Sequence, residues 1–510
     1  MFSFGKFNDL KFSKSGVKMK ITFIIPNTAW FEKRYWHNFP YTEAILTAVL
    51  KREGYSVDNI DANINNLSEK DLERELRERN PDIIGIGQMA LEYKDCIHKS
   101  FEIIKKVNPN IITLTGGIYP TLSPEIVTKD KNIDYVIFGE GEDRILKLLN
   151  AIKNKTGFEE IDGLAYRKDG EVIINPQNKL KAVDLDSLPL PDYSGFDMQR
   201  YTNYQQKYTQ NFKFKKLPVG ITMTSRGCPF QCTFCSSREL YSQKLRTMSV
   251  ERVLREVDML INDYGVRELI FVDDSLLWPK ERAIKIMDGL IERKKQGKDI
   301  VWKSNNLGIH SMDDEILDKM KESGCYQVIV SIESGCPATL DRMKKPVNLE
   351  KATEVLKKIK ERGFDSVSSN FVIGMPGDTW DDIREGFSYV DDLVNKELLH
   401  YVVFHIATPF PKTELYEICK REKCIPEDFS FENPSYYGFG KGVINTPEFK
   451  SNQLQVLRAY EWDRINFKTP KQKEIIAEML GITLDELEKW RKDTIENVGV
   501  NIKTVDKREE

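Results

Sequence analysis

Three cysteines constrain this sequence most, because their spacing requires them to meet in the folded chain. They are Cys228, Cys232 and Cys235, with the spacing C-x3-C-x2-C, and they directly follow a strand-like run at residues 218–224. A glycine and a proline within the stretch can bend the backbone so that the three sulfurs converge. Thiolates are soft ligands that suit iron–sulfur clusters. We therefore predict a four-iron cluster with three protein ligands and one iron left open.

Two other interpretations of these cysteines stay open. They could be unrelated buried thiols, or half of a zinc site. Zinc needs a fourth Cys or His nearby, and no histidine lies between His98 and His310, so the cluster is favoured. The other five cysteines are scattered singly, which favours free buried thiols over a disulfide framework and indicates a reducing cytoplasm: Cys96, Cys325, Cys336, Cys419 and Cys424.

The cysteine stretch resembles the cluster loop of the radical S-adenosylmethionine (SAM) enzymes, including the aromatic Phe234 before the third cysteine. The resemblance extends over roughly residues 20–420. It implies a 4Fe-4S cluster whose open iron chelates SAM. It also implies that an electron from the cluster cleaves SAM to a 5′-deoxyadenosyl radical, and that a flavodoxin-type or ferredoxin-type protein donates this electron.

Residues 19–150 alternate strand-like runs with helical stretches. This alternation predicts a parallel, doubly wound, Rossmann-like sheet, which binds ligands at the carboxyl ends of its strands. Two loops expected there are rich in glycine: Thr115-Gly116-Gly117 and Gly139-Glu140-Gly141-Glu142. Glycines permit close approach of a large ligand, although turns of this kind also occur without one.

This domain and its two loops are similar to the cobalamin-binding domain of one radical SAM subfamily. Tyr119 stands where that subfamily often has a histidine, and the Asp-x-His-x-x-Gly motif of cobalamin mutases is absent. Many members of the subfamily lack the motif and hold cobalamin with no protein histidine on cobalt, while some relatives keep the domain and lose the cofactor. The resemblance implies cobalamin contacts at Thr115, Gly116, Gly117, Gly139 and Gly141.

Residues 217–420 continue the strand–helix alternation, now with a polar residue near the end of most strands. The pattern predicts a partial (βα)6 TIM-like barrel with its site on the carboxyl face. The resemblance implies that the radical is generated at the cluster, and it names no catalytic side chain. A carboxylate can pair with the SAM amino group, or it can instead cap a helix. The implied SAM contacts are Phe234, Asp273, Asp274, Glu333 and Gly374.

The remaining segments complete the predicted organisation. We expect an N-terminal extension at residues 1–18, a bridging hairpin and linker at 151–216, and a helical, substrate-capping region at 421–510. The aromatic and basic stretch 201–216 could alternatively contact nucleic acid. A net charge of −3 argues against a polyanionic partner, and no apolar run is long enough to span a membrane.

The resemblance favours a cobalamin-dependent C-methyltransferase. In that family the deoxyadenosyl radical removes hydrogen from an unactivated carbon, which then takes the cobalt-bound methyl group. The alternatives are a cyclisation or rearrangement with the same cofactors, methylthio transfer to RNA, and a non-enzymatic cobalamin-binding regulator. We expect the substrate to be a small molecule or a peptide.

Overall fold

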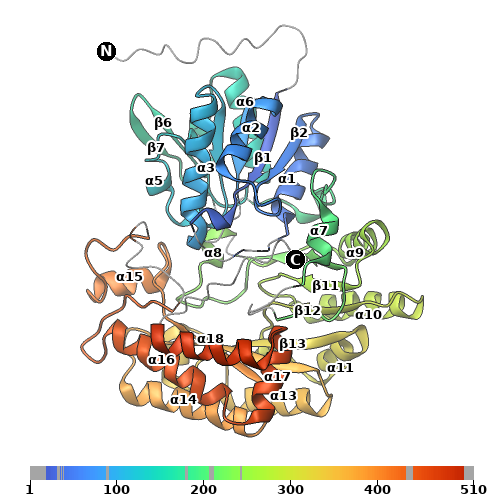
Figure 1. The fold of residues 1–510 in the computed structure, drawn as a ribbon, viewed down its shortest axis with the longest axis vertical. Helices are drawn as coiled ribbons and strands as arrows, with labels where there is room; N and C mark the ends of the chain where they lie inside the picture. The colour runs from blue at the N-terminus through green and yellow to red at the C-terminus, as the bar shows by residue number, and fades with distance from the viewer. Residues whose placement is uncertain are drawn as a thin grey trace. The chain divides into compact units, whose positions relative to one another are not determined.

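The computed structural model describes residues 19–31, 35, 37, 39–87, 91–178, 182–205, 212–241, 244–431, 433 and 440–498. The predicted extension at residues 1–18 lies outside the described residues. The chain divides into two compact units, one containing the described residues up to Asp197 and the other those from Met198 onward (Figure 1). Within the described residues, no helix is both long enough and apolar enough to cross a bilayer.

The first unit is built on a seven-stranded sheet with the order β2-β1-β3-β4-β5-β6-β7. The first five strands are parallel, as predicted, and the predicted hairpin extends the same sheet as an antiparallel edge. Strands β3, β4 and β5 are buried throughout, as expected for a parallel sheet covered on both faces. The strands are β1 (Lys20–Ile25), β2 (Ser56–Asp61), β3 (Ile83–Ile86), β4 (Ile112–Thr115), β5 (Tyr135–Ile137), β6 (Leu164–Lys168) and β7 (Glu171–Ile174).

Helices connect the parallel strands of this unit. Helix α1 is followed by Gly54 at φ 84°, a left-handed position that stops a helix at low cost for glycine. Ser68 caps α2 through a reciprocal capping box with Asp71. The helices are α1 (Tyr41–Arg52), α2 (Glu69–Arg79), α3 (Lys94–Val107), α4 (Ile118–Leu122), α5 (Pro124–Val127) and α6 (Glu142–Asn154).

The second unit is built on a six-stranded, wholly parallel sheet with the order β15-β14-β13-β12-β11-β8. Each strand lies beside its predecessor in the chain, which is the arrangement of a partial barrel. Five of the strands lie at strand-like runs of the sequence, at residues 218–224, 268–272, 326–332, 371–373 and 402–406, whereas the sequence analysis missed β12. The strands are β8 (Val219–Thr222), β11 (Glu268–Phe271), β12 (Val301–Ser304), β13 (Cys325–Glu333), β14 (Ser366–Ile373) and β15 (Tyr401–Ile406).

Helices follow most of these strands, and three more helices end the described chain. Helix α16 covers the open edge of the sheet at β15, where the Asn466 side chain donates to the Val402 carbonyl and accepts from its amide. A covered edge cannot pair with another chain. The helices are α7 (Met198–Asn203), α8 (Ser237–Leu240), α9 (Val250–Tyr264), α10 (Lys280–Lys295), α11 (Asp314–Ser323), α12 (Pro337–Met343), α13 (Leu349–Glu361), α14 (Trp380–Asn395), α15 (Glu414–Arg421), α16 (Ser451–Asn466), α17 (Pro470–Leu480) and α18 (Leu484–Asn497).

All eight cysteines are free thiols, and the five outside the predicted cluster loop are buried. Two of these five are not isolated as expected. The Cys424 amide donates to the Cys419 carbonyl at 3.0 Å, and the Cys424 thiol lies 3.6 Å from the same carbonyl oxygen. This contact belongs to the left-handed ending of α15, at which Lys423 has a φ of 54°.

A buried ion pair joins strands β11 and β12 of the second sheet. Lys303 Nζ lies 3.8 Å from Glu268 Oε1, and both side chains are wholly buried. The Tyr326 hydroxyl donates to the same carboxylate at 2.7 Å, and the Lys215 and Lys216 amides donate to its second oxygen. Burial lowers the Lys303 pKa to about 8, although Glu268 opposes this shift. Glu268 thus fixes three adjacent strands and the segment that enters β8.

Replacing Glu268 with alanine should strongly destabilise the second unit. The change leaves Lys303 as a buried cation without its carboxylate, a loss of about 3–5 kcal/mol. Urea unfolding monitored by tryptophan fluorescence measures the difference. Glu361→Ala, on an exposed residue of α13, is the matched control and should change stability by less than about 0.5 kcal/mol. Equal stability of the two variants would show that Glu268 does not stabilise the second unit.

Candidate active site

The predicted cluster loop begins just beyond the carboxyl end of β8. Its start is fixed by β9 (Ser225–Arg226), which pairs antiparallel with β10 (Arg246–Thr247). Two backbone hydrogen bonds tie the middle of the loop to neighbouring helices: Thr233 donates to the Met343 carbonyl at 3.0 Å and accepts from the Leu415 amide at 2.9 Å. The loop is therefore attached to the sheet, to α12 and to α15.

The structure brings the three predicted ligands together. Cys228, Cys232 and Cys235 are each partly exposed, and the thiols lie close enough to influence one another electrostatically. Burial raises the Cys235 pKa to about 12 and also raises the Cys232 pKa. Three soft donors on one partly exposed loop fit a 4Fe-4S cluster with an open iron. These cysteines would hold the cluster.

Asp273 holds the beginning of this loop. Its buried carboxylate accepts from the Thr224 amide at 3.0 and 3.1 Å, from the Thr224 hydroxyl at 2.7 Å and from the Ser225 hydroxyl at 2.5 Å. Burial raises the Asp273 pKa, and these donors partly offset the shift. All the contacts lie just before the first cysteine, so Asp273 is a positioning residue for the loop.

Asp274 has a different environment and is more exposed than Asp273. The Ser237 hydroxyl donates to its carboxylate at 2.6 Å, and the Gly227 amide is a second donor. Asp274 therefore contacts both sides of the cysteine loop. A role for Asp274 in binding the SAM amino group stays a prediction, and its exposure makes it the more accessible of the two carboxylates.

Glu333 ends β13 next to the cysteine loop. Its backbone has a φ of 73°, beside a register shift between β13 and β14. Its carboxylate accepts from Lys345 at 3.2 Å, and both side chains are nine-tenths buried. Both residues interact electrostatically with Cys232. Lys345, which the sequence analysis missed, therefore places a positive charge beside the predicted cluster and SAM ribose contacts.

The other predicted SAM contacts lie on the same unit. Gly374 has a φ of 84°, and a Cβ atom there would lie 2.3 Å from Leu454 of α16, so only glycine fits. Phe234 is partly exposed between two of the cysteines. No contact recorded for the described residues decides whether Phe234 or Gly374 binds SAM, so both roles stay predictions.

The glycine loops of the first unit follow β4 and β5. Gly117 and Gly139 have φ values of 98° and 76°, in the left-handed region that favours glycine. A Cβ atom at Gly116 would lie 3.2 Å from the Ile137 carbonyl. The Thr115 hydroxyl donates to the Ile86 carbonyl at 2.9 Å, and Gly141 precedes α6. The glycines form tight turns at the carboxyl ends of adjacent strands, where doubly wound sheets bind ligands, and these residues would hold cobalamin there.

One threonine connects the two glycine loops. The Thr121 hydroxyl donates to the Gly117 carbonyl at 2.7 Å and accepts from the Gly139 amide at 2.8 Å. The side chain is buried. The two loops are therefore held at a fixed separation by the same residue.

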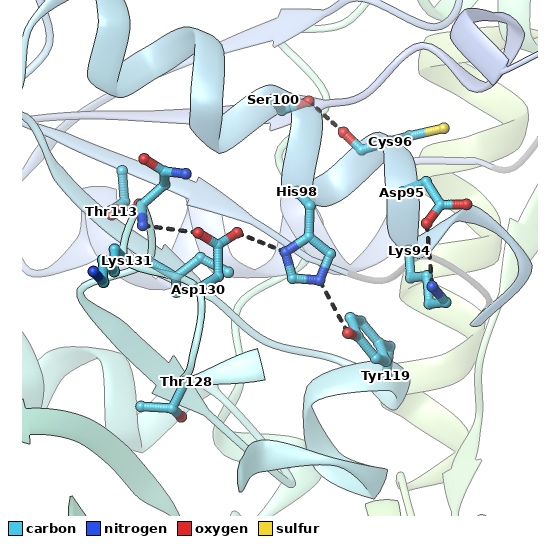
Figure 2. Close-up of polar contacts among 12 residues, drawn as sticks. Lys94, Asp95, Cys96, His98, Ser100, Thr113, Tyr119, Thr128, Asp130 and Lys131 are labelled. Atoms are coloured by element: carbon cyan, nitrogen blue, oxygen red, sulfur yellow. Dashed lines mark hydrogen bonds and ion pairs between the residues drawn. The ribbon is translucent and has the colours of Figure 1, made fainter. Parts of the chain in front are cut away.

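A second set of hydrogen bonds fixes helix α4, which directly follows the first glycine loop. The Tyr119 hydroxyl is 3.0 Å from His98 Nε2, and Asp130 is 2.6 Å from His98 Nδ1 (Figure 2). Tyr119 is fully buried, and the Asn132 amide holds the Asp130 carboxylate at 2.8 Å. The tyrosine that replaces the histidine of the subfamily thus contacts a histidine on α3. His98 was missed by the sequence analysis, in which the unusual Tyr119 was the one available signal.

Asp273→Ala should impair assembly of the cluster site. The change removes the acceptor of the Thr224 amide, the Thr224 hydroxyl and the Ser225 hydroxyl, and each buried donor left without a partner costs about 1–3 kcal/mol. We expect iron bound after anaerobic reconstitution to fall at least about twofold. Asp274→Asn is the control, because its amide oxygen can still accept from the Ser237 hydroxyl, and it should bind iron normally. Full iron content in Asp273→Ala would show that the loop does not need this residue.

Tyr119→Phe should loosen the first glycine loop. Loss of the hydroxyl leaves His98 Nε2 without this partner, which should cost about 1 kcal/mol of stability and weaken hydroxocobalamin binding. Differential scanning fluorimetry and absorbance titration measure the two effects. Tyr135→Phe is the control, because this buried tyrosine of β5 stacks on Phe158 and no hydrogen bond of its hydroxyl is recorded in the described residues. Equal behaviour of the two variants would exclude a role for the His98 contact.

Comparisons with known proteins agree with the presence of both domains. The radical SAM superfamily model matches residues 222–390, and the B12-binding domain model matches residues 35–149. An uncharacterized methyltransferase of Pyrococcus horikoshii is 31% identical over 78% of this chain and 83% of its own length. Cytidylyl-2-hydroxyethylphosphonate methyltransferase of Streptomyces wedmorensis is 28% identical over 80% and 82% of the two chains. Anaerobic magnesium-protoporphyrin IX monomethyl ester cyclase of Rubrivivax gelatinosus is 26% identical over 78% and 70%.

Two solved structures share the fold. The radical SAM methyltransferase TsrM from Kitasatospora setae has a TM-score of 0.67 at 18% identity, covering 80% of this chain and 79% of its own. The cobalamin-dependent radical SAM enzyme OxsB has a TM-score of 0.71 at 17% identity, covering 94% and 72%. The order of the two domains and the level of identity to the Pyrococcus relative lead to one conclusion. The chain belongs to the radical SAM enzymes with an N-terminal cobalamin-binding domain, whose cofactors are a 4Fe-4S cluster, SAM and cobalamin.

Proposed function

We propose that this enzyme is a C-methyltransferase that acts on an unactivated carbon of a small molecule or peptide. The observation that carries the proposal is the similarity to two methyltransferases, each matched over more than four fifths of its length. These matches are long enough to include both functional domains. They therefore support transfer of a methyl group better than they support a role limited to cobalamin binding.

The residues of this chain would bind and position the cofactors. When bound, the cluster and cobalamin would supply the electron that cleaves SAM and the carrier of the methyl group. Asp273 would hold the cysteine loop in register with the sheet, and Asp274 would accept from the SAM amino group. Glu333, which pairs with Lys345, would accept from the ribose hydroxyls.

The buried surroundings of these groups would also limit access of water. Glu333 and Asp273 are each more than nine-tenths buried, so a reactive carbon radical near them would meet few solvent molecules.

We also propose that a flavodoxin-type or ferredoxin-type protein donates the electron. The domain limits that we propose are those given by the sequence: a cobalamin domain at residues 19–150, a bridge at 151–216, a barrel at 217–420 and a substrate-capping region at 421–510.

A second function is favoured by one specific relative. The cyclase of Rubrivivax gelatinosus is matched over 70% of its length. A cyclisation with the same cofactors would form 5′-deoxyadenosine from SAM but would not consume a methyl group. The two functions therefore differ in their products and can be separated by one assay.

The assay uses the reconstituted enzyme, SAM with a trideuterated methyl group, a reduced flavodoxin and a metabolite extract. Mass spectrometry should find a product in which a trideuteromethyl group replaces hydrogen, together with S-adenosylhomocysteine and 5′-deoxyadenosine. Cys232→Ala should lose all three, because two thiolates do not hold the cluster. A product formed with 5′-deoxyadenosine alone would overturn methyl transfer and support the cyclase function.

A further inference from the structure

The order of the strands in the first unit locates a ligand crevice. Strand β1 lies between β2 and β3, so the chain changes its direction of winding between β1 and β3. In doubly wound sheets, ligands bind at the carboxyl ends of the strands at this switch point. Gly87 directly follows β3 there, and Gly116 directly follows β4.

A buried carboxyl group lies at this crevice. Glu43, the third residue of α1, is 5% exposed. A Cβ atom built on Gly87 would lie 3.7 Å from Glu43 Oε1 and 4.0 Å from the Gly116 carbonyl. The Glu43 side chain therefore reaches from the first turn of α1 to the glycine ends of β3 and β4, next to the first glycine loop.

The protein itself does little to stabilise this group. The one hydrogen-bond donor recorded for Glu43 among the described residues is its own backbone amide, and Asp61 nearby is a like charge. Burial, followed by the smaller effect of Asp61, raises the Glu43 pKa to about 7. A buried polar group with so few partners costs folding free energy. Stabilisation of the folded protein therefore does not explain why a buried glutamate occupies this position, whereas binding of a ligand in the crevice would explain it.

We propose that Glu43 binds cobalamin by accepting a hydrogen bond from one of its carboxamide groups. This inference rests on cobalamin as the cofactor of this domain. The corrin ring carries amide side chains that donate N–H groups, which match a carboxyl oxygen. The phosphate of the nucleotide tail is a poorer partner than an amide, because it repels the ionised form of the carboxyl group. The carboxamide N–H of cobalamin would supply the hydrogen-bond donor that the described protein residues, apart from the backbone amide of Glu43 itself, do not provide to the Glu43 side chain.

Two variants separate binding from structure. Glu43→Leu removes the acceptor and should weaken binding of hydroxocobalamin about tenfold, which is about 1.4 kcal/mol. Glu43→Gln keeps an oxygen acceptor and should bind within about threefold of the unchanged protein. Glu53→Leu, at an exposed acid beyond the end of the same helix, should bind normally. Absorbance titration of the full-length apoprotein measures each affinity.

The melting temperature of the apoprotein provides the independent measurement. Glu43→Leu should melt at the same or a higher temperature, because it removes a buried polar group. A lower melting temperature together with weaker binding would overturn the proposal in favour of a structural role, and unchanged affinity would also overturn it. If the unchanged protein does not bind hydroxocobalamin, the cofactor assignment fails first. If it binds and all variants bind equally, only the role of Glu43 fails.

Discussion

The carboxylate of Asp273 is the contact on which the arrangement of the active site depends. It follows β11 and accepts from residues that follow β8, so it joins the ends of two paired strands. The cysteine loop starts immediately after those donors. A loop of this length would otherwise sample many conformations, and ordering it costs entropy for each residue. Attaching its first residues to the sheet means that only the part that holds the cluster remains to be ordered by the metal.

The same geometric constraint shapes both units. In a parallel sheet all carboxyl ends lie along one edge, so residues distant in sequence meet there. In the second unit this edge brings together the cysteine loop, Glu333 and Asp273. In the first unit it brings together Gly87 and two glycine loops joined by Thr121. The chemistry differs because one edge presents thiols and carboxylates and the other presents bare backbone.

Much of the fold could be predicted from the sequence because its signals are local. Apolar residues at 253, 257, 260 and 261 have the spacing of one helical face, and α9 spans Val250–Tyr264. Gly481 separates two amphipathic runs near the end of the chain, and α17 ends at this glycine. Strand β12 was missed because its buried Lys303 interrupts the apolar run, and only the distant Glu268 makes that lysine acceptable. Sequence also predicted the three cysteines, but not Lys345 or His98, because their partners are set by tertiary contacts.

Glu333 shows how the site keeps a costly conformation. A non-glycine residue with a φ of 73° is strained, and such residues persist only where the surroundings hold them. Here the register shift after Ser331 turns the end of β13, and Lys345 binds the carboxylate. Relaxing the backbone would withdraw a buried anion from its cation and from the neighbourhood of Cys232. The strained backbone of Glu333 and its contact with Lys345 therefore act together: both are needed to place the charged pair beside the cluster loop.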